Sequence, residues 1–238
     1  MQVDIIGVPV GLGASRRGVD MGPAAIRYSG LHEAVLRMGL HCRDLGNIEV
    51  PVGDLPEDNP KARYKKAIAD INRRLSDAVA ESLAQGHRPV ILGGDHSIAA
   101  GSILGTRRVY GKVGVIWMDA HGDFNNEETT LSGNLHGMSL AAVVGAGTRG
   151  MVDGFSPSES CVDPHKVAIV GTPVQGGLTY REAHLAAELI AGSPKLRTLD
   201  LVELNPILDH ANQTGEPAVS LLCSLLGKRI FRGAGENA

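Results

Sequence analysis

The feature that most constrains the fold is a series of short apolar segments separated by longer helical patterns. The six segments predicted as strands are Val3–Val10, His41–Leu45, Pro89–Leu92, Lys112–Met118, Lys166–Val170 and Leu199–Glu203. Several of them are apolar without alternation, which is typical of a parallel sheet that is covered on both faces. The sequence therefore predicts an α/β fold of three layers, with a mostly parallel, doubly wound sheet and helices on both faces.

Amphipathic stretches between these strands predict the helices. The clearest runs from Lys61 to Gln85, and Gly86 is a plausible stop. Its apolar stripe consists of Ile68, Ile71, Leu75, Val79 and Leu83. The further predicted helices are Ala24–Met38, Ser97–Tyr110, Met138–Val144, Tyr180–Ala191 and Ala218–Leu226. There is no internal repeat, so we expect a single domain over residues 1–238, with its chemistry at the carboxyl ends of the strands.

Composition narrows the class of protein. Of the 238 residues 43% are apolar and the formal net charge is −3, which argues against disorder and against a nucleic-acid or membrane partner. The three cysteines have no metal-ligand spacing, and no apolar run approaches the roughly 18 residues of a membrane span. The amino terminus carries no basic and apolar leader pattern. We therefore expect a cytoplasmic protein.

Two glycine motifs suggest a nucleotide site but lack its context. Gly145–Gly150 matches G-x-G-x-x-G, yet a helical pattern precedes it and a loop follows it. Gly11-Leu12-Gly13 does follow a strand, but Arg16 occupies the third glycine position. We interpret both as loops, which makes a nicotinamide enzyme a distant alternative.

A cluster of imidazoles and carboxylates gives the strongest chemical signal. Asp119, His121 and Asp123 close the strand Lys112–Met118, and in extended backbone positions i, i+2 and i+4 face the same side. The turn after Pro89–Leu92 brings His96 to the same rim if the two strands are neighbours. Two imidazoles and two carboxylates without a thiolate suit Mn²⁺, Fe²⁺ or Co²⁺ better than structural Zn²⁺. The structural alternative makes Asp95 a helix cap and His121 an ordinary strand-end residue.

These motifs resemble those of the ureohydrolase family, the arginases and agmatinases, and within it the bacterial arginases. The two signature motifs are Gly93-Gly94-Asp95-His96-Ser97 and Asp119-Ala120-His121-Gly122-Asp123. Supporting segments follow in family order, and they are Arg16–Val19 with Gly22-Pro23, Ser132–Gly137, Gly176–Glu182 and Glu203–Pro206. The resemblance covers the chain from Val3 to Phe231.

The resemblance implies hydrolysis of L-arginine to L-ornithine and urea by a hydroxide that bridges two Mn²⁺ ions. By similarity His96 and Asp123 would bind one ion, His121 would bind the other, and Asp119 would bridge them. A homo-oligomer, a trimer or hexamer, is also implied.

The same resemblance assigns the substrate contacts. His136 would carry a proton to the leaving amine, and Glu203 would pair with the substrate guanidinium, so that both act in catalysis together with Asp123. Asn125, Ser132 and Asn134 would bind the α-carboxylate and α-amino groups, which favours arginine over agmatine.

The chain departs from the family pattern in one place. The family carries an Asp-x-Asp pair on a later strand, whereas here Gly171 runs directly into Thr172. We expect that roughly 60 residues, about two βαβ units, are missing at this point. The second ion would then be held by little more than His121 and Asp119, so we expect at most one tight metal and severely reduced activity. We also expect unpaired strand edges and exposed apolar faces.

Three functions stay open at this stage. The first is a Mn²⁺-dependent arginase. The second is a sister enzyme that acts on agmatine or a guanidino acid. The third is a catalytically impaired or non-catalytic paralogue, suggested by the missing Asp-x-Asp pair.

Overall fold

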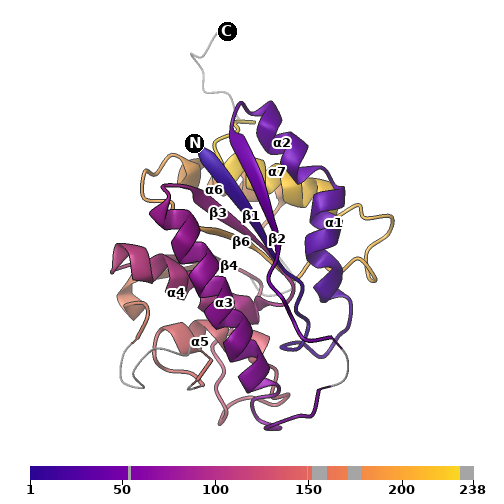
Figure 1. The fold of residues 1–238 in the computed structure, drawn as a ribbon, viewed down its shortest axis with the longest axis vertical. Coiled ribbons are helices and arrows are strands. Elements are labelled where there is room, and N and C mark those ends of the chain that lie inside the picture. Colours follow the sequence, from indigo (N-terminus) through magenta and orange to yellow (C-terminus); the bar gives the residue numbers. More distant parts are fainter. Residues whose placement is uncertain (53–54, 149, 152–159, 171–177, 231–238) are drawn as a thin grey trace.

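The computed structural model of the chain describes residues 1–52, 55–148, 150–151, 160–170 and 178–230 (Figure 1). Its strands are β1 (Gln2–Val8), β2 (His41–Asn47), β3 (Arg88–Gly93), β4 (Val115–Met118), β5 (Val167–Val170) and β6 (Leu199–Leu201). All six predicted strands are confirmed, with ends that differ by a few residues. Every pairing is parallel, and the strands form a four-stranded sheet of order β2-β1-β3-β6 and a separate pair β4-β5.

Seven α-helices connect these strands in the described residues. They are α1 (Gly22–Tyr28), α2 (Leu31–Arg37), α3 (Lys65–Ala84), α4 (Ala99–Tyr110), α5 (Ser139–Val143), α6 (Tyr180–Ala191) and α7 (Gly215–Leu225). Short 3₁₀ helices lie at Val19–Met21 (η1), His96–Ile98 (η2), Leu135–Met138 (η3) and Pro164–Lys166 (η4). The prediction of one helix over Ala24–Met38 was wrong. Gly30 adopts a left-handed φ of 79° and divides the segment into α1 and α2.

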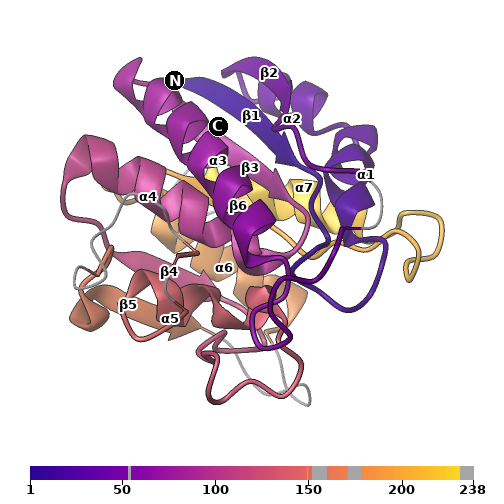
Figure 2. The same ribbon diagram turned by 60° about the horizontal axis from the view of Figure 1, so that its bottom comes forward.

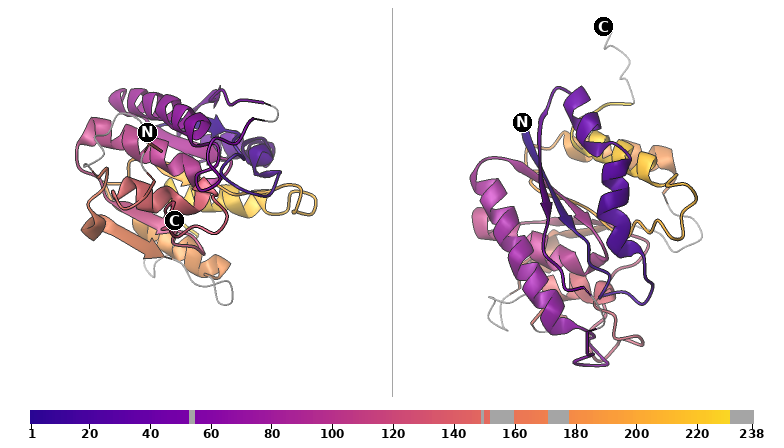
Figure 3. Two further views of the ribbon diagram at one scale, coloured as in Figure 1. Left: turned by 90° about the horizontal axis from the view of Figure 1, so that it is seen from below. Right: turned by 45° about the vertical axis from the view of Figure 1, so that its right-hand side comes forward.

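Alternate residues of β1 pack on opposite sides of the four-stranded sheet. Val3 and Ile5 belong to the core beneath α1, α2 and α7, while Ile6 and Val8 belong to the core beneath α3. Figure 3 shows α3 and α7 on opposite sides of this sheet. The predicted three-layer α/β fold is thus confirmed.

The β4-β5 pair stands apart from the four-stranded sheet (Figure 2). Ala99 of α4 shares a buried cluster with Trp117 of β4, and Ser102 of α4 donates a hydrogen bond to Asp200 of β6. Helix α4 therefore bridges the two sheets. Ile116 on β4 and Ile169 on β5 are about half exposed, so the expected exposure of apolar side chains at the strand edges is present.

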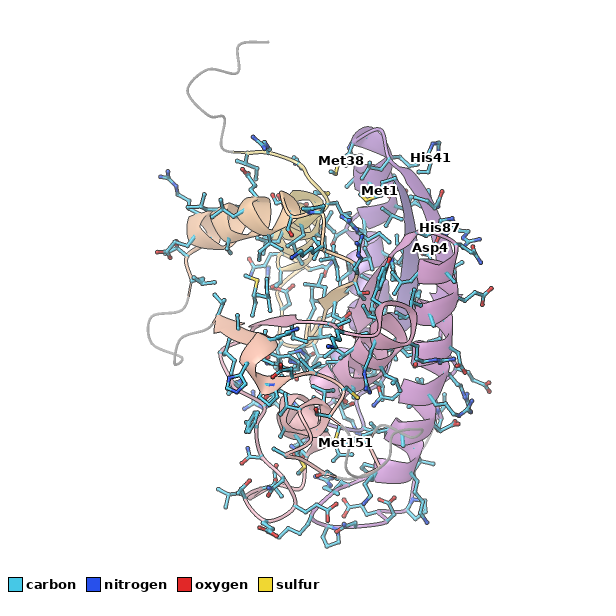
Figure 4. The ribbon with its side chains drawn as sticks, turned by 90° about the vertical axis from the view of Figure 1, so that its left-hand side faces the viewer. Met1, Asp4, Met38, His41, His87 and Met151 are labelled. Atoms are coloured by element: carbon cyan, nitrogen blue, oxygen red, sulfur yellow. The ribbon has the colours of Figure 1, made fainter. Side chains whose placement is uncertain are left out.

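A buried ionic group fastens the amino-terminal end of the four-stranded sheet. The Asp4 carboxylate on β1 accepts from Ser82 Oγ at 2.7 Å and from Arg43 Nη2 at 2.9 Å, and it lies 3.0 Å from His87 Nδ1. Burial raises the pKa of Asp4, but these hydrogen bonds outweigh it and leave the pKa below its usual value. Figure 4 shows Asp4 beside His87, at the end of the sheet away from Met151. Their role is structural.

In the part of the chain that the structure describes, no helix combines the length and the apolar character that crossing a bilayer requires.

Candidate active site

The turn after β3 presents the first predicted ligand. Gly94 packs so closely on the segment after β1 that a Cβ there would lie 1.9 Å from the carbonyl oxygen of Val10. The fully buried Asp95 accepts backbone N–H bonds from Gly13 at 2.8 Å and from Ser97 at 3.0 Å. It thereby caps η2, as the structural alternative expected, and also holds the Gly11–Gly13 loop against the site. Burial raises the pKa of Asp95, although these hydrogen bonds act to lower it.

His96 lies between two carboxylates at the carboxyl ends of β3 and β4. Its Nδ1 is 2.8 Å from Asp119 Oδ2 and 3.0 Å from Asp123 Oδ2, and its ring stacks on Trp117 with centroids 4.0 Å apart. Burial lowers the pKa of His96, but the hydrogen bonds to Asp119 and Asp123 outweigh it and raise the pKa to about 9. In the absence of a metal ion, the imidazolium therefore balances part of the carboxylate charge.

These three residues fit a divalent cation. One ligand atom from each of His96, Asp119 and Asp123 lies within 4.8 Å of the other two. Carboxylate oxygens combined with an imidazole nitrogen suit Mn²⁺ and similar ions. This is the only such cluster of three or more groups in the described residues.

His121, the fourth predicted ligand, lies at the outer edge of this cluster. Its side chain is 66% exposed, and its Nδ1 is 3.3 Å from Asp119 Oδ1. The strand-alternation prediction was wrong here, because β4 ends at Met118 and the chain turns at once. Asp119 folds back on the backbone N–H of His121 at 2.9 Å, and Asp123 has a left-handed φ of 45°. Asp119 and Asp123 converge through this turn rather than along a strand.

A second pair, His136 and Glu203, joins two distant segments at the same rim. His136 Nδ1 in η3 lies 2.7 Å from Glu203 Oε1, which follows β6. The backbone N–H of Glu203 donates to Gly94 at 2.8 Å, and that of His136 donates to Gly13 at 3.2 Å. The hydrogen bond to Glu203 raises the pKa of His136. Burial raises the pKa of Glu203, but His136 outweighs it and leaves that pKa below its usual value.

The remaining predicted residues lie on the loop that precedes η3. Asn125 donates its N–H to Gly137 and accepts from Thr129 Oγ1. Ser132 Oγ accepts the N–H of Asn134 at 3.2 Å. Asn134 also exchanges hydrogen bonds with Ser15, at 2.8 and 3.1 Å. The structure thus brings Asn134 against the loop that follows β1.

Three basic residues missed by the sequence reasoning hold this loop in place. Arg63 donates its N–H to Gly133 at 2.9 Å and its Nη1 to Asn134 Oδ1 at 3.2 Å. Lys61 Nζ donates to the Thr130 carbonyl at 3.0 Å, and Lys65 Nζ lies 3.2 Å from a Glu127 carboxylate oxygen. Their alternating spacing at the start of α3 was the available signal, but nothing local indicates which loop they contact.

Comparison with known proteins identifies the family. A sequence model described as the Arginase family matches residues 1–157 and 158–227. The chain belongs to the arginase family. The resemblance drawn from the two signature motifs is therefore confirmed, and the nicotinamide alternative is set aside.

Individual members of the arginase family support this assignment. An arginase of Bacillus caldovelox is 36% identical over 296 residues, covering 96% of this chain and 99% of that protein. An arginase of Bacillus subtilis is 36% identical over 293 residues with the same coverage. The crystal structure of the B. caldovelox arginase superposes with a TM-score of 0.88 over 96% of this chain and 99% of its own. A B. subtilis formimidoylglutamase, with 20% identity and a TM-score of 0.67, shares the fold.

The length of these alignments shows an internal difference from the relatives. The B. caldovelox alignment spans 296 residues, whereas 96% of 238 residues is only about 228. At about 68 positions of this alignment, therefore, the relative has a residue and this chain has none. The break in the family match falls between residues 157 and 158. That position, the predicted junction of Gly171 with Thr172 and the motif residues Gly176-Gly177 all lie outside the described residues.

Proposed function

We propose that the chain binds L-arginine and hydrolyses its guanidinium group to give L-ornithine and urea. The observation that carries this proposal is the convergence of two groups at one rim, the cluster of His96, Asp119 and Asp123 and the His136–Glu203 pair. The arginases named among the relatives support the choice of substrate.

The cation in this proposal is Mn²⁺, held by His96, Asp119 and Asp123. When bound, it supplies a lowered pKa for a water molecule and hence a nucleophile at neutral pH. His121 and a shared Asp119 are the groups left for a second ion, and His121 is 66% exposed. We therefore propose one tightly bound Mn²⁺ per chain and a weak second one.

Glu203 and His136 divide the substrate chemistry between them. The carboxylate of Glu203, which has a lowered pKa, pairs with the substrate guanidinium. His136, which has a raised pKa, carries a proton that it delivers to the departing amine. Their contact at 2.7 Å keeps both side chains in place before substrate arrives.

The loop of Asn125, Ser132 and Asn134 is proposed to bind the α-carboxylate and α-amino groups. Agmatine lacks the carboxylate, so this loop favours arginine. The chain is also proposed to form a homo-oligomer, a trimer or hexamer, which light scattering after size-exclusion chromatography would test.

A direct test measures urea release from arginine, agmatine and guanidinobutyrate after loading with Mn²⁺. We expect arginine to be preferred, with activity well below that of the B. caldovelox enzyme measured in parallel. Preference for agmatine or guanidinobutyrate would instead favour the sister-enzyme alternative. Two tight Mn²⁺ ions with normal turnover would contradict the proposed weak second site.

The non-catalytic alternative is favoured by the exposure of His121, and metal titration separates it from the proposal. Calorimetry should show one Mn²⁺ per chain in the unmodified protein and none in His96→Ala. His210→Ala, at an exposed histidine that does not belong to the cluster, is the matched control and should keep the ion. A chain that binds Mn²⁺ without releasing urea from any guanidino substrate would be a non-catalytic paralogue.

A further inference from the structure

A cavity of about 1070 Å³ separates the two sheets. Its walls are formed by β4, including Val115, Ile116 and Met118, and by β6, including Leu199 and Leu201. Helix α4 lines it with Ala99, Ser102, Ile103 and Thr106, and Ile190 of α6 and Leu225 of α7 lie on its border. Two strands with unpaired edges in the described residues therefore border one space, which also reaches His96, Asp119 and Glu203 of the candidate active site.

The two edge strands run in the same direction. Residues that follow β3 and β4 meet where His96 contacts Asp119, and the N–H of Glu203, after β6, bonds to Gly94, after β3. At the other end, the guanidinium of Arg197, just before β6, lies 4.7 Å from the ring centre of Tyr110, which precedes β4. A strand between β4 and β6 would thus be parallel to both.

The separation of β4 and β6 is inferred from the helix that bridges them. A single helix, α4, contacts β6 through Ser102 and packs with β4 through Ala99. A helix with its side chains is about 10–12 Å across, and two strand spacings of about 4.8 Å give nearly the same width. One inserted strand would join the two sheets into a continuous one.

We propose that this space is an acceptor site for one short parallel β-strand supplied by a separate polypeptide. The recognition would be strand addition, in which main-chain hydrogen bonds form to β4 on one side and to β6 on the other. The apolar side chains of Ile116 and Met118 favour apolar residues in the incoming strand.

Two observations favour a separate polypeptide as the source of this strand. All six described strands are already paired in their own sheets. A second copy of the chain therefore offers, among the described residues, no strand with both edges free to pair with β4 and β6. About 68 positions of the B. caldovelox alignment are absent from this chain, yet the superposition keeps both sheets at a TM-score of 0.88. The two sheets therefore stand as they do in a relative whose chain has these additional residues.

To test this, the full chain is co-expressed with a tagged polypeptide. That polypeptide is the segment of the B. caldovelox arginase that has no counterpart in this chain. Native mass spectrometry should show a one-to-one complex. Amide hydrogen exchange at residues 115–118 and 199–201 should slow by about tenfold or more in that complex. Neither readout depends on Mn²⁺ or on catalysis.

Two matched variants locate the contact. Ile116→Glu places a charge in the cavity wall and should weaken the complex about tenfold or more, because an unpaired buried carboxylate is costly. Ile169→Glu changes a similarly exposed isoleucine, 54% against 50%, that does not line the cavity, and should leave the complex unchanged. Both side chains are exposed, so circular dichroism should show folded proteins.

Three results would overturn the proposal. They are the absence of a complex, a complex that Ile116→Glu leaves intact, and exchange rates at residues 115–118 and 199–201 that do not change. A homodimer of the chain alone that Ile116→Glu dissociates would assign the space to a second copy instead.

Discussion

Replacing Gly94 by alanine should destabilise the fold and the metal cluster together. The new Cβ would lie 1.9 Å from the Val10 carbonyl oxygen and 2.7 Å from the Val10 nitrogen, and both are backbone atoms that cannot rotate away. Gly94 does not have a left-handed φ, so lack of space is the cause of the effect. The turn that carries His96 has to move away from Val10, in the segment after β1.

The size of the effect follows from the hydrogen bonds of this turn. Gly94 donates to Val8 at 3.1 Å, Asp95 donates to Val10 at 2.8 Å, and Glu203 donates to Gly94 at 2.8 Å. Each contributes about 1 kcal/mol net, and overpacking costs about 1–3 kcal/mol. If the turn shifts enough to weaken most of them, the free energy of unfolding should fall by about 3–5 kcal/mol.

Urea unfolding followed by circular dichroism measures this loss, and calorimetry measures the accompanying fall in Mn²⁺ affinity. Gly122→Ala is the matched control, because no atom lies within 4 Å of the position its Cβ would take. It reports the gain of about 0.4–1 kcal/mol expected from restricting the unfolded chain. Equal unfolding midpoints and equal Mn²⁺ affinities for the two variants would refute the reasoning.

Three further predictions concern single side chains. Burial raises the pKa of Asp200 to about 6, so the contribution of Asp200 to the free energy of unfolding should be greatest below about pH 4 and decline as pH rises towards 6. The decline is at most about 3 kcal/mol, and urea titrations at several pH values should show that Asp200→Asn removes it. Glu203→Gln should lower the pKa of His136 in the metal-free protein, as measured by NMR titration, and an unchanged pKa would contradict their contact. Arg63→Met should weaken L-ornithine binding by about tenfold, because Asn134 loses a charge-assisted hydrogen bond, whereas Arg16→Met should not.

Much of the secondary structure follows from the sequence because periodicity is a local property. The apolar stripe from Ile68 to Leu83 predicts α3, and α6 matches its predicted bounds of Tyr180 and Ala191. The break at Gly30 was missed, because a glycine within an amphipathic pattern can either interrupt a helix or be tolerated in it. Only the backbone conformation decides between these.

The candidate site could be predicted only in part. The residue types and the order of the His96 and Asp119–Asp123 motifs indicated a metal site without any structure. Extended geometry was the wrong reason for the convergence of Asp119 and Asp123, because a turn follows Met118, and this turn leaves His121 largely exposed beside Asp119. Local spacing could not show this turn, since it depends on where β4 stops pairing with β5.

The sequence by itself determined the layered α/β class, the strand segments and the chemical groups available for catalysis. Only the tertiary structure decided that His136 meets Glu203, 67 positions further along the chain, and that Arg63 holds Asn134. It also decided that β4 and β6 border an open space. Contacts between distant segments depend on how sheets and helices pack. The periodicity of either segment's sequence does not show which other segment it will contact.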